Sequence, residues 1–114
     1  MTPERFAEFT QDSTVYFTRF GQPYGAEQYL SGKRVIWTFF DGTCQRGVWF
    51  GANDEICFQY DGQERPLCWY FFDDGEEQRA RVVGDDPEGD LVVAGQDQEP
   101  LICPGPDVGV SYRP

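Results

Sequence analysis

Short apolar runs alternate with turn-forming residues between Arg34 and Phe72, the most strongly patterned stretch of the chain. This stretch holds all three tryptophans and three of the four cysteines. It is interrupted at Asp41-Gly42, at 51–54 and at 61–64, where Gly, Asn and Asp favour tight turns. Short apolar strands separated by such turns predict an antiparallel β-meander with three hairpins, and we take 34–72 as the core of the fold.

Each turn predicts a register between the strands that it joins. A two-residue turn at Asp41-Gly42 gives three opposed pairs: Phe39 and Cys44, Trp37 and Arg46, Val35 and Val48. A turn at Asn53-Asp54 gives two pairs: Trp49 and Phe58, Phe50 and Cys57. A turn that begins at Gly62 gives three: Cys57 and Cys68, Phe58 and Leu67, Ile56 and Trp69.

These registers sort the meander into two faces, because side chains alternate along a strand. One face holds Ile36, Phe40, Trp49, Ile56, Phe58, Tyr60, Leu67, Trp69 and Phe71. The other holds Val35, Trp37, Phe39, Cys44, Val48, Phe50, Cys57, Cys68, Tyr70 and Phe72. Both faces are strongly apolar, so we expect one to line the core and another part of the chain to cover the other. The second register is the least firmly determined. A one-residue slip there would exchange the two faces.

The residues before the meander predict a short helix over about 3–10. Thr2 can cap this helix, and Pro3 suits its first position. Phe6 and Phe9 fall on one face of the helix, which is expected to cover one mouth or face of the sheet.

Further strands are expected at five places: 13–20, 24–30, 76–83 as an edge strand, 90–94 and 101–103. Seven or eight short strands with regularly spaced turns predict an all-β antiparallel fold, closing into a small barrel of the lipocalin or calycin type. A β-sandwich is the alternative. We expect one domain over 1–114, with an irregular Pro/Gly-rich tail at about 104–114.

The four cysteines are Cys44, Cys57, Cys68 and Cys103. An even number in a small β-rich domain predicts two disulfides, for which three connectivities exist. The third hairpin register favours Cys57–Cys68, which leaves Cys44–Cys103 by exclusion. No metal or other cofactor is expected, because zinc sites of this size use C-x-x-C pairs or histidines and the chain has neither.

Disulfides favour a periplasmic or secreted location. The N-terminal residues lack the basic and apolar regions of a signal peptide, so we expect that a signal preceded this sequence and was removed. A formal charge of −11, from 20 acidic and 9 basic residues, argues against binding to nucleic acid or to an anionic membrane. No segment is apolar for long enough to span a membrane. The acidic surface favours solubility or a basic partner.

No recognisable catalytic group stands out, and we expect a non-enzymatic protein. The chain has no histidine, the usual general base, and its serines lie outside any nucleophile-elbow motif. The acidic runs at 73–77 and 85–90 could offer oxygen ligands to calcium, but they lack the spacing of a calcium loop and are better interpreted as solvated turns.

Two groups of side chains are candidates for binding. Arg46, opposite Trp37 in the predicted register, could form a cation–π pair or an ion pair with Glu27, or recognise an anionic ligand. The aromatic set of the core could line a cavity for an apolar ligand, although tight packing without a cavity is the expectation. This set comprises Trp37, Trp49, Phe58, Trp69 and Phe71.

The order of short motifs resembles a group of small exported alphaproteobacterial proteins to which no activity is assigned. The motifs are 24–30 (YGAEQYL), Trp37, 41–44 (DGTC), 47–49 (GVW), 56–60 (ICFQY) and 68–69 (CW). The resemblance implies export and a β-fold from the helix to about Cys103, and it implies no catalytic residue.

These observations predict an exported binding domain, with two hypotheses for its partner. The first is a basic protein such as a lysozyme-type hydrolase, by analogy with small periplasmic lysozyme inhibitors of barrel-like shape. The second is a small apolar ligand carried inside the barrel.

Overall fold

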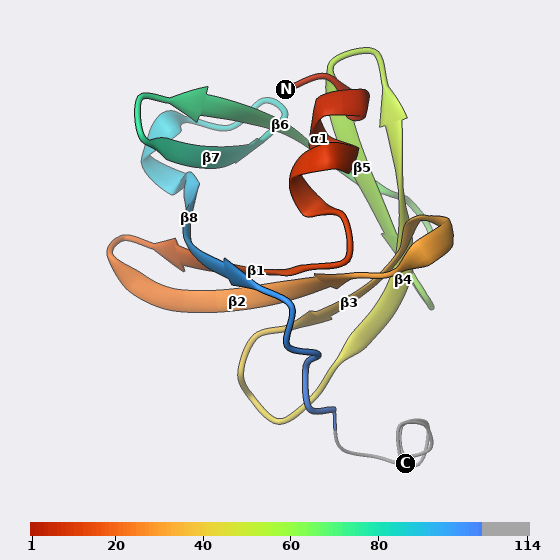
Figure 1. The fold of residues 1–114 in the computed structure, drawn as a ribbon. Coiled ribbons are helices and arrows are strands. Elements are labelled where there is room, and N and C mark those ends of the chain that lie inside the picture. The colour runs from red at the N-terminus through yellow and green to blue at the C-terminus, as the bar shows by residue number, and fades with distance from the viewer. Residues whose placement is uncertain (104–114) are drawn as a thin grey trace.

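The computed structural model describes residues 1–103, which form a closed antiparallel barrel (Figure 1). The strands follow each other around the barrel in chain order, and the first strand pairs with the last. Their bounds are β1 (Thr14–Arg19), β2 (Gln22–Tyr29), β3 (Arg34–Thr38), β4 (Gln45–Ala52), β5 (Glu55–Tyr60), β6 (Leu67–Asp74), β7 (Glu77–Val82) and β8 (Leu91–Asp97). Two short 3₁₀ turns, η1 (Ser31–Lys33) and η2 (Pro87–Gly89), precede β3 and β8.

The predicted all-β barrel is confirmed, and the sandwich alternative is wrong. Two finer expectations are also wrong. The strand at 77–82 is not an edge, because β7 pairs with both β6 and β8, and residues 101–103 form no strand. The predicted irregular tail at about 104–114 lies outside the described residues.

The helix α1 (Pro3–Thr10) covers one end of the barrel and confirms the predicted N-terminal helix. Its first turn is capped by Thr2, whose hydroxyl accepts a hydrogen bond from the Arg5 amide at 3.1 Å. Phe6 is fully buried, and in Figure 1 the helix lies within the outline of the ring of strands. The ring of Phe6 contacts four aromatic rings at centroid distances of 4.6–6.3 Å, those of Tyr29, Trp49, Phe58 and Phe71.

A glycine in β4 allows this close approach of the helix. A Cβ atom at Gly51 would lie 2.4 Å from Cγ of Pro3, well inside van der Waals contact. Any larger residue at this position would therefore push the start of α1 away from the strand.

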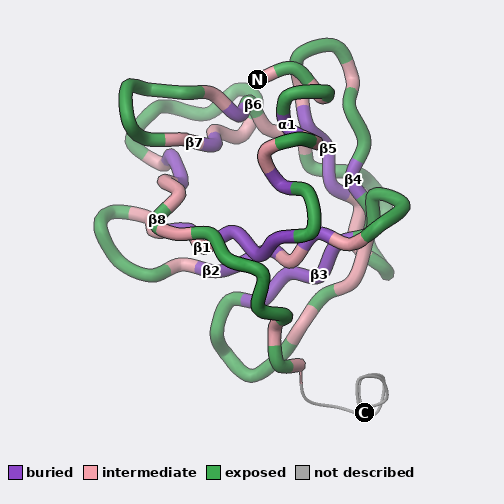
Figure 2. Tube along the Cα trace, viewed as in Figure 1, coloured by how far each residue is buried: buried purple, intermediate pink, exposed green. Residues whose placement is uncertain are grey.

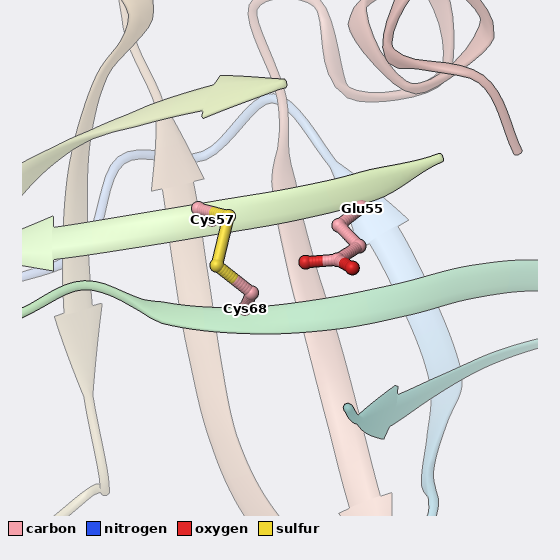
Figure 3. A group of neighbouring side chains, drawn as sticks. All are labelled: Glu55, Cys57 and Cys68. Atoms are coloured by element: carbon pink, nitrogen blue, oxygen red, sulfur yellow. A yellow bond between two sulfur atoms is a disulfide. The ribbon is translucent and has the colours of Figure 1, made fainter. Parts of the chain in front are cut away.

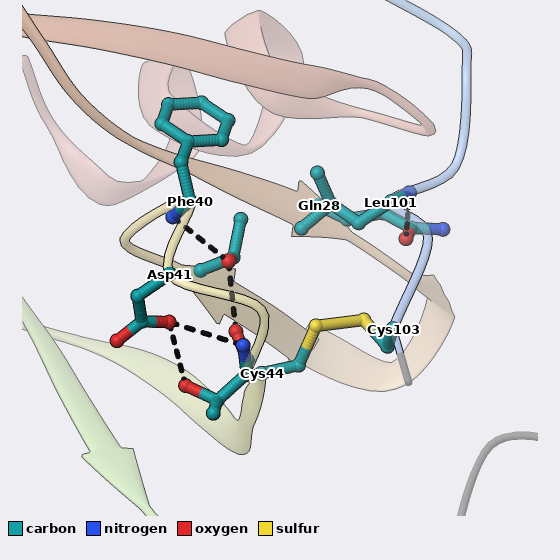
Figure 4. The surroundings of a disulfide bond; sticks show 8 residues. Gln28, Phe40, Asp41, Cys44, Leu101 and Cys103 are labelled. Carbon is teal, nitrogen blue, oxygen red and sulfur yellow. Dashed lines mark hydrogen bonds between the residues drawn. A yellow bond between two sulfur atoms is a disulfide. The ribbon is translucent and has the colours of Figure 1, made fainter. Parts of the chain in front are cut away.

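The second and third predicted registers are confirmed, but the first is wrong by one residue. Trp37 pairs with Gln45 rather than Arg46, and Val35 pairs with Gly47. The connection is a six-residue loop over 39–44 instead of a two-residue turn (Figure 4).

Side-chain hydrogen bonds explain this longer loop. The Asp41 carboxylate accepts bonds from the amide and the hydroxyl of Thr43, at 3.0 and 2.7 Å. The Thr38 hydroxyl accepts from the Phe40 amide at 3.1 Å and donates to the Thr43 carbonyl at 2.8 Å. Phe40 itself adopts a φ of 64°. Backbone groups that a tight hairpin would pair with each other are thus satisfied by side chains.

The slip exchanges the two faces of β3. Val35 and Trp37 point into the barrel together with Trp49, whereas Ile36 points outward. Most buried residues of the molecule lie on the strands, and the turns that join the strands are mostly exposed (Figure 2).

The outer face is covered only in part, contrary to expectation. After β8, the Leu101 amide donates to the Gln28 side chain at 3.0 Å, and the Glu99 carbonyl accepts from Thr14 at 2.7 Å. This segment therefore runs over the outside of β1 and β2. Val48 and Phe50 on β4 keep exposed fractions of 43% and 38%.

Both predicted disulfides are confirmed. Cys57 and Cys68 bridge β5 and β6 with a Cα–Cα distance of 3.9 Å, and Cys44 and Cys103 tie the 39–44 loop to the segment after β8 at 5.7 Å. Glu55 lies beside the first bridge, with its carboxylate within 4.8 Å of both sulfur atoms (Figure 3). The sulfurs are bonded to each other, so this group does not offer thiolates to a metal. Two disulfides fit a periplasmic or extracellular protein.

An ion-pair network reinforces the β7–β8 seam, which has only two pairs in register. Asp90, just before β8, accepts two bonds from Arg81 at 2.7 and 2.8 Å, and Arg79 lies 3.5 Å away. The Asp90 side chain is 2% exposed. The sequence interpretation of 85–90 as a solvated turn is therefore wrong for this residue.

Candidate ligand-binding site

A cavity of about 160 Å³ lies inside the barrel at the end away from α1. The antiparallel topology places the β1–β2, β3–β4, β5–β6 and β7–β8 connections at this end, because α1 precedes β1 at the other. The wall is made largely of aromatic side chains: Phe17, Tyr24, Glu27, Trp37, Phe39, Gln45, Phe58, Tyr60, Gln63, Leu67, Trp69, Phe71, Ala80 and Leu91.

The position of the Trp37 indole depends on a glycine in the neighbouring strand. A Cβ atom at Gly25 would lie 2.3 Å from Cζ2 of Trp37, so the indole occupies the space that a side chain at this position of β2 would need. Trp37 then contacts Phe17 and Phe39 at centroid distances of 6.1 and 5.2 Å. Phe39 in turn meets Tyr24 edge-on at 5.5 Å. These contacts join the wall to the 39–44 loop at the mouth.

One carboxyl group interrupts this apolar wall. Glu27 on β2 points inward and has an exposed fraction of 3%. The hydroxyl of Tyr60 lies 2.8 and 2.7 Å from its two carboxyl oxygens and is the donor when Glu27 is ionised. Burial raises the pKa of Glu27 to about 8, although the bond from Tyr60 acts in the opposite direction. The group therefore titrates near neutral pH.

Two tyrosines surround this carboxyl and stay neutral. Burial, with the nearby Glu27 charge, raises the pKa of both Tyr60 and Tyr29. The Tyr60 ring stacks on Phe58 with an interplanar angle of 7° and a centroid distance of 6.3 Å. The Tyr29 hydroxyl is buried without a hydrogen-bond partner among the described residues.

The rim of the cavity is unusually apolar for a water-facing surface. Phe20 in the β1–β2 turn is 71% exposed, Phe39 and Phe40 are 45% and 52% exposed, and Leu67 at the start of β6 is 47% exposed. Phe39 and Leu67 line the cavity, and the chain topology places Phe20 and Phe40 in connections at the same end of the barrel.

The structure brings some of the predicted site residues together and separates others. Glu27, Trp37 and Trp69 line the cavity, whereas Trp49 packs on Phe6 at the opposite end. Strand alternation places Arg46 on the outer face, across the barrel wall from Glu27, and Glu27 bonds to Tyr60 instead.

The expectation of a fully packed barrel is wrong at this end. Four of the five aromatic residues proposed as core or cavity wall do line a cavity: Trp37, Phe58, Trp69 and Phe71. Sequence reasoning missed Tyr60 and Tyr24. The available signal for Tyr60 was Glu27 on β2, because a carboxyl group on an inward position of a strand needs a hydrogen-bond donor nearby.

A second hollow of about 300 Å³ lies beside the turn between α1 and β1. Its lining is mostly polar. Arg34 is the one basic residue in this lining, and its guanidinium donates hydrogen bonds to the Ser31 carbonyl and hydroxyl at 2.9 and 3.2 Å. The aromatic cavity is therefore the better candidate for ligand binding.

Comparison of the chain with protein-family models, curated proteins and solved structures found no significant match. Among the described residues, no helix combines the length and apolar character needed to cross a membrane. Expectations about function thus depend on the geometry of the cavity.

Proposed function

We propose that the protein binds a small, largely apolar ligand in the aromatic cavity at the open end of its barrel. The observation that carries this proposal is the cavity itself. A hollow of about 160 Å³ remains in a domain whose many aromatic side chains favour complete packing. An empty apolar cavity lowers stability, since its lining loses dispersion contacts. A ligand would restore those contacts.

The size of the cavity limits what can enter. A cavity of about 150 Å³ lined by apolar side chains holds a molecule the size of benzene. The enclosed part here is therefore suited to one ring, one branched alkyl group or the end of a longer chain, with the rest of a longer ligand lying against the exposed rings of the rim.

We further propose that binding takes place in the periplasm or outside the cell, in keeping with the two disulfides. Recognition of a basic protein through the acidic surface stays a prediction. The cavity favours the small-ligand hypothesis, because a protein partner needs no hollow inside the barrel.

A titration with 3,3-dimethylbutan-1-ol, a compact neutral alcohol, tests the proposal. We expect NMR shifts and changed tryptophan fluorescence, since Trp37 and Trp69 line the cavity. The expected affinity is in the millimolar range or tighter, about −4 kcal/mol. Shifts confined to other parts of the barrel, or none up to about 10 mM, would refute the proposal.

A pair of variants in β4 provides the control. Gln45 is exposed at the mouth, so Gln45→Trp is expected to obstruct the cavity without disturbing the core. Val48→Trp adds the same side chain to the outer face of the same strand, where the position is 43% exposed. Binding should weaken in the first variant only.

A further inference from the structure

Glu27 is a carboxyl group in a cavity wall that offers it no fixed positive charge. None of the lining residues, all within the described part of the chain, is Lys or Arg. Its hydrogen bonds come from the neutral hydroxyl of Tyr60. A buried carboxylate without a cation is costly, and a neutral amide of the same shape would keep the bond to Tyr60 at less cost.

Aromatic side chains share the cavity wall with this carboxyl group. Trp37 is the direct partner of Glu27 across β2 and β3, and Phe58 and Tyr60, whose rings stack on each other, line the same cavity from β5. Indole faces attract cations most strongly among the aromatic side chains, and a carboxylate beside such rings is the chemistry by which proteins hold alkylated ammonium groups.

Resting on the proposed function, we infer that the ligand of this cavity carries an organic ammonium group, held between the Glu27 carboxylate and the surrounding aromatic rings. The enclosed volume matches this group, since a trimethylammonium head with its first methylene has about as many heavy atoms as benzene. The negative charge of the whole chain, −11, adds a long-range attraction for cations.

Binding of such a cation is coupled to release of the Glu27 proton. The titratable groups that face Glu27 are Tyr60 on β5 and Tyr29 on its own strand, and its partners on the flanking strands are Val15 and Trp37, which do not titrate. The cation needs the ionised carboxylate. Its affinity is therefore expected to fall about tenfold for each pH unit below 8 and to level off above it.

The experiment compares choline with 3,3-dimethylbutan-1-ol, which has the same shape but carbon in place of the charged nitrogen. Calorimetric titration of the full chain at about pH 9, above the pKa of Glu27, is expected to show choline binding at least about tenfold tighter than the alcohol. Choline keeps its charge at every pH, so its pH profile reports on the protein alone.

Substitution of the carboxyl group identifies the source of the preference. Glu27→Gln keeps an acceptor for Tyr60 and is expected to bring the affinity for choline down to that for the alcohol. Glu64→Gln, in the exposed β5–β6 loop, removes one charge near the mouth and should keep the preference. If Glu27→Gln does not fold, the pH profiles of the unmodified chain for choline and the alcohol supply the same comparison.

The two proposals fail in different ways. If the alcohol binds and choline does not bind more tightly, or if Glu27→Gln retains the preference, the ammonium inference is overturned and the cavity remains a site for neutral ligands. If neither compound binds, the proposed function is refuted, and with it the inference that depends on it.

Discussion

The two ends of the barrel are built from the same alternation of aromatic residues, yet one is filled and the other hollow. At the α1 end, the rings of Tyr29, Trp49 and Phe71 converge on Phe6, a side chain supplied from outside the sheet. At the other end, Trp37 and Tyr24 have no such central side chain, and a cavity remains between the walls. In this barrel the packed end is therefore the one where another element supplies a side chain to the axis.

The polar groups follow the same division. Asp90, outside the barrel, is held by two arginines, so the neighbouring Arg81 keeps the pKa of its carboxyl below the ordinary value. Glu27, inside the open end, has only a tyrosine hydroxyl, and its pKa is raised. Asp90 thus has the environment of a structural ion pair, and Glu27 that of a group open to further interaction.

Removal of the central ring of the closed end should have the largest effect. Phe6→Ala is expected to lower the free energy of unfolding by about 3–5 kcal/mol, because it leaves a void among four rings. Phe20 lies in the turn at the open end and is 71% exposed, so Phe20→Ala should change the free energy of unfolding by less than about 0.5 kcal/mol. Urea unfolding at one pH measures both, and equal effects would show that α1 does not hold the barrel together.

The pH dependence of stability should show an effect of intermediate size. Glu27 binds its proton up to about pH 8 in the folded chain but only up to about 4.5 when unfolded. Between these values the folded state holds more protons, so raising the pH removes stability, by up to about 1.4 kcal/mol per pH unit.

Urea unfolding of the unmodified chain and of Glu27→Gln, at several values between pH 5 and 8, tests this sign. The variant should lose the downward slope. Asp90 has the opposite pH dependence. Because its pKa is lowered in the folded chain, Asp90 stabilises the fold above the ordinary carboxyl pKa of 3.8, and this stabilisation is lost as the pH falls below that value. A slope that persists in Glu27→Gln would assign it to another group.

Shortening of Leu67 at the rim should have a small effect on stability and a visible one on binding. Leu67 lines the cavity and is 47% exposed, so Leu67→Ala is expected to cost less than about 1 kcal/mol of stability. Affinity for 3,3-dimethylbutan-1-ol should fall severalfold. A variant that lost stability but bound the alcohol unchanged would make this residue part of the scaffold instead.

The sequence was sufficient to predict the parts of the fold that depend on local patterns. The capped helix, the registers between β4, β5 and β6, and the Cys57–Cys68 bridge all follow from turn residues and strand alternation. The register of the first hairpin could not be predicted in this way. It depended on whether the side chains of Asp41 and Thr38 would form hydrogen bonds with the loop backbone, in place of the backbone bonds between the two strands. A short polar side chain can favour either arrangement.

The candidate site was less predictable, because it depends on contacts between residues far apart in sequence. Glu27 and Tyr60 are 33 positions apart, and they meet only when the barrel closes. The cavity depends on a balance of volumes across the barrel that no run of residues records. The sequence around Gly25 does not indicate that this residue makes room for the Trp37 ring.

Closure of the barrel between β1 and β8 also bears on how fast the chain folds. The hairpins of the meander join near neighbours, whereas this seam pairs Thr14 with Asp97 and so encloses nearly the whole described chain. Ordering so long a loop costs entropy before its contacts form, which favours late closure. Val93→Ala, opposite Phe17 in this seam, should therefore speed unfolding in stopped-flow experiments and leave the refolding rate nearly unchanged. Equal changes in both rates would place the seam in the folding nucleus.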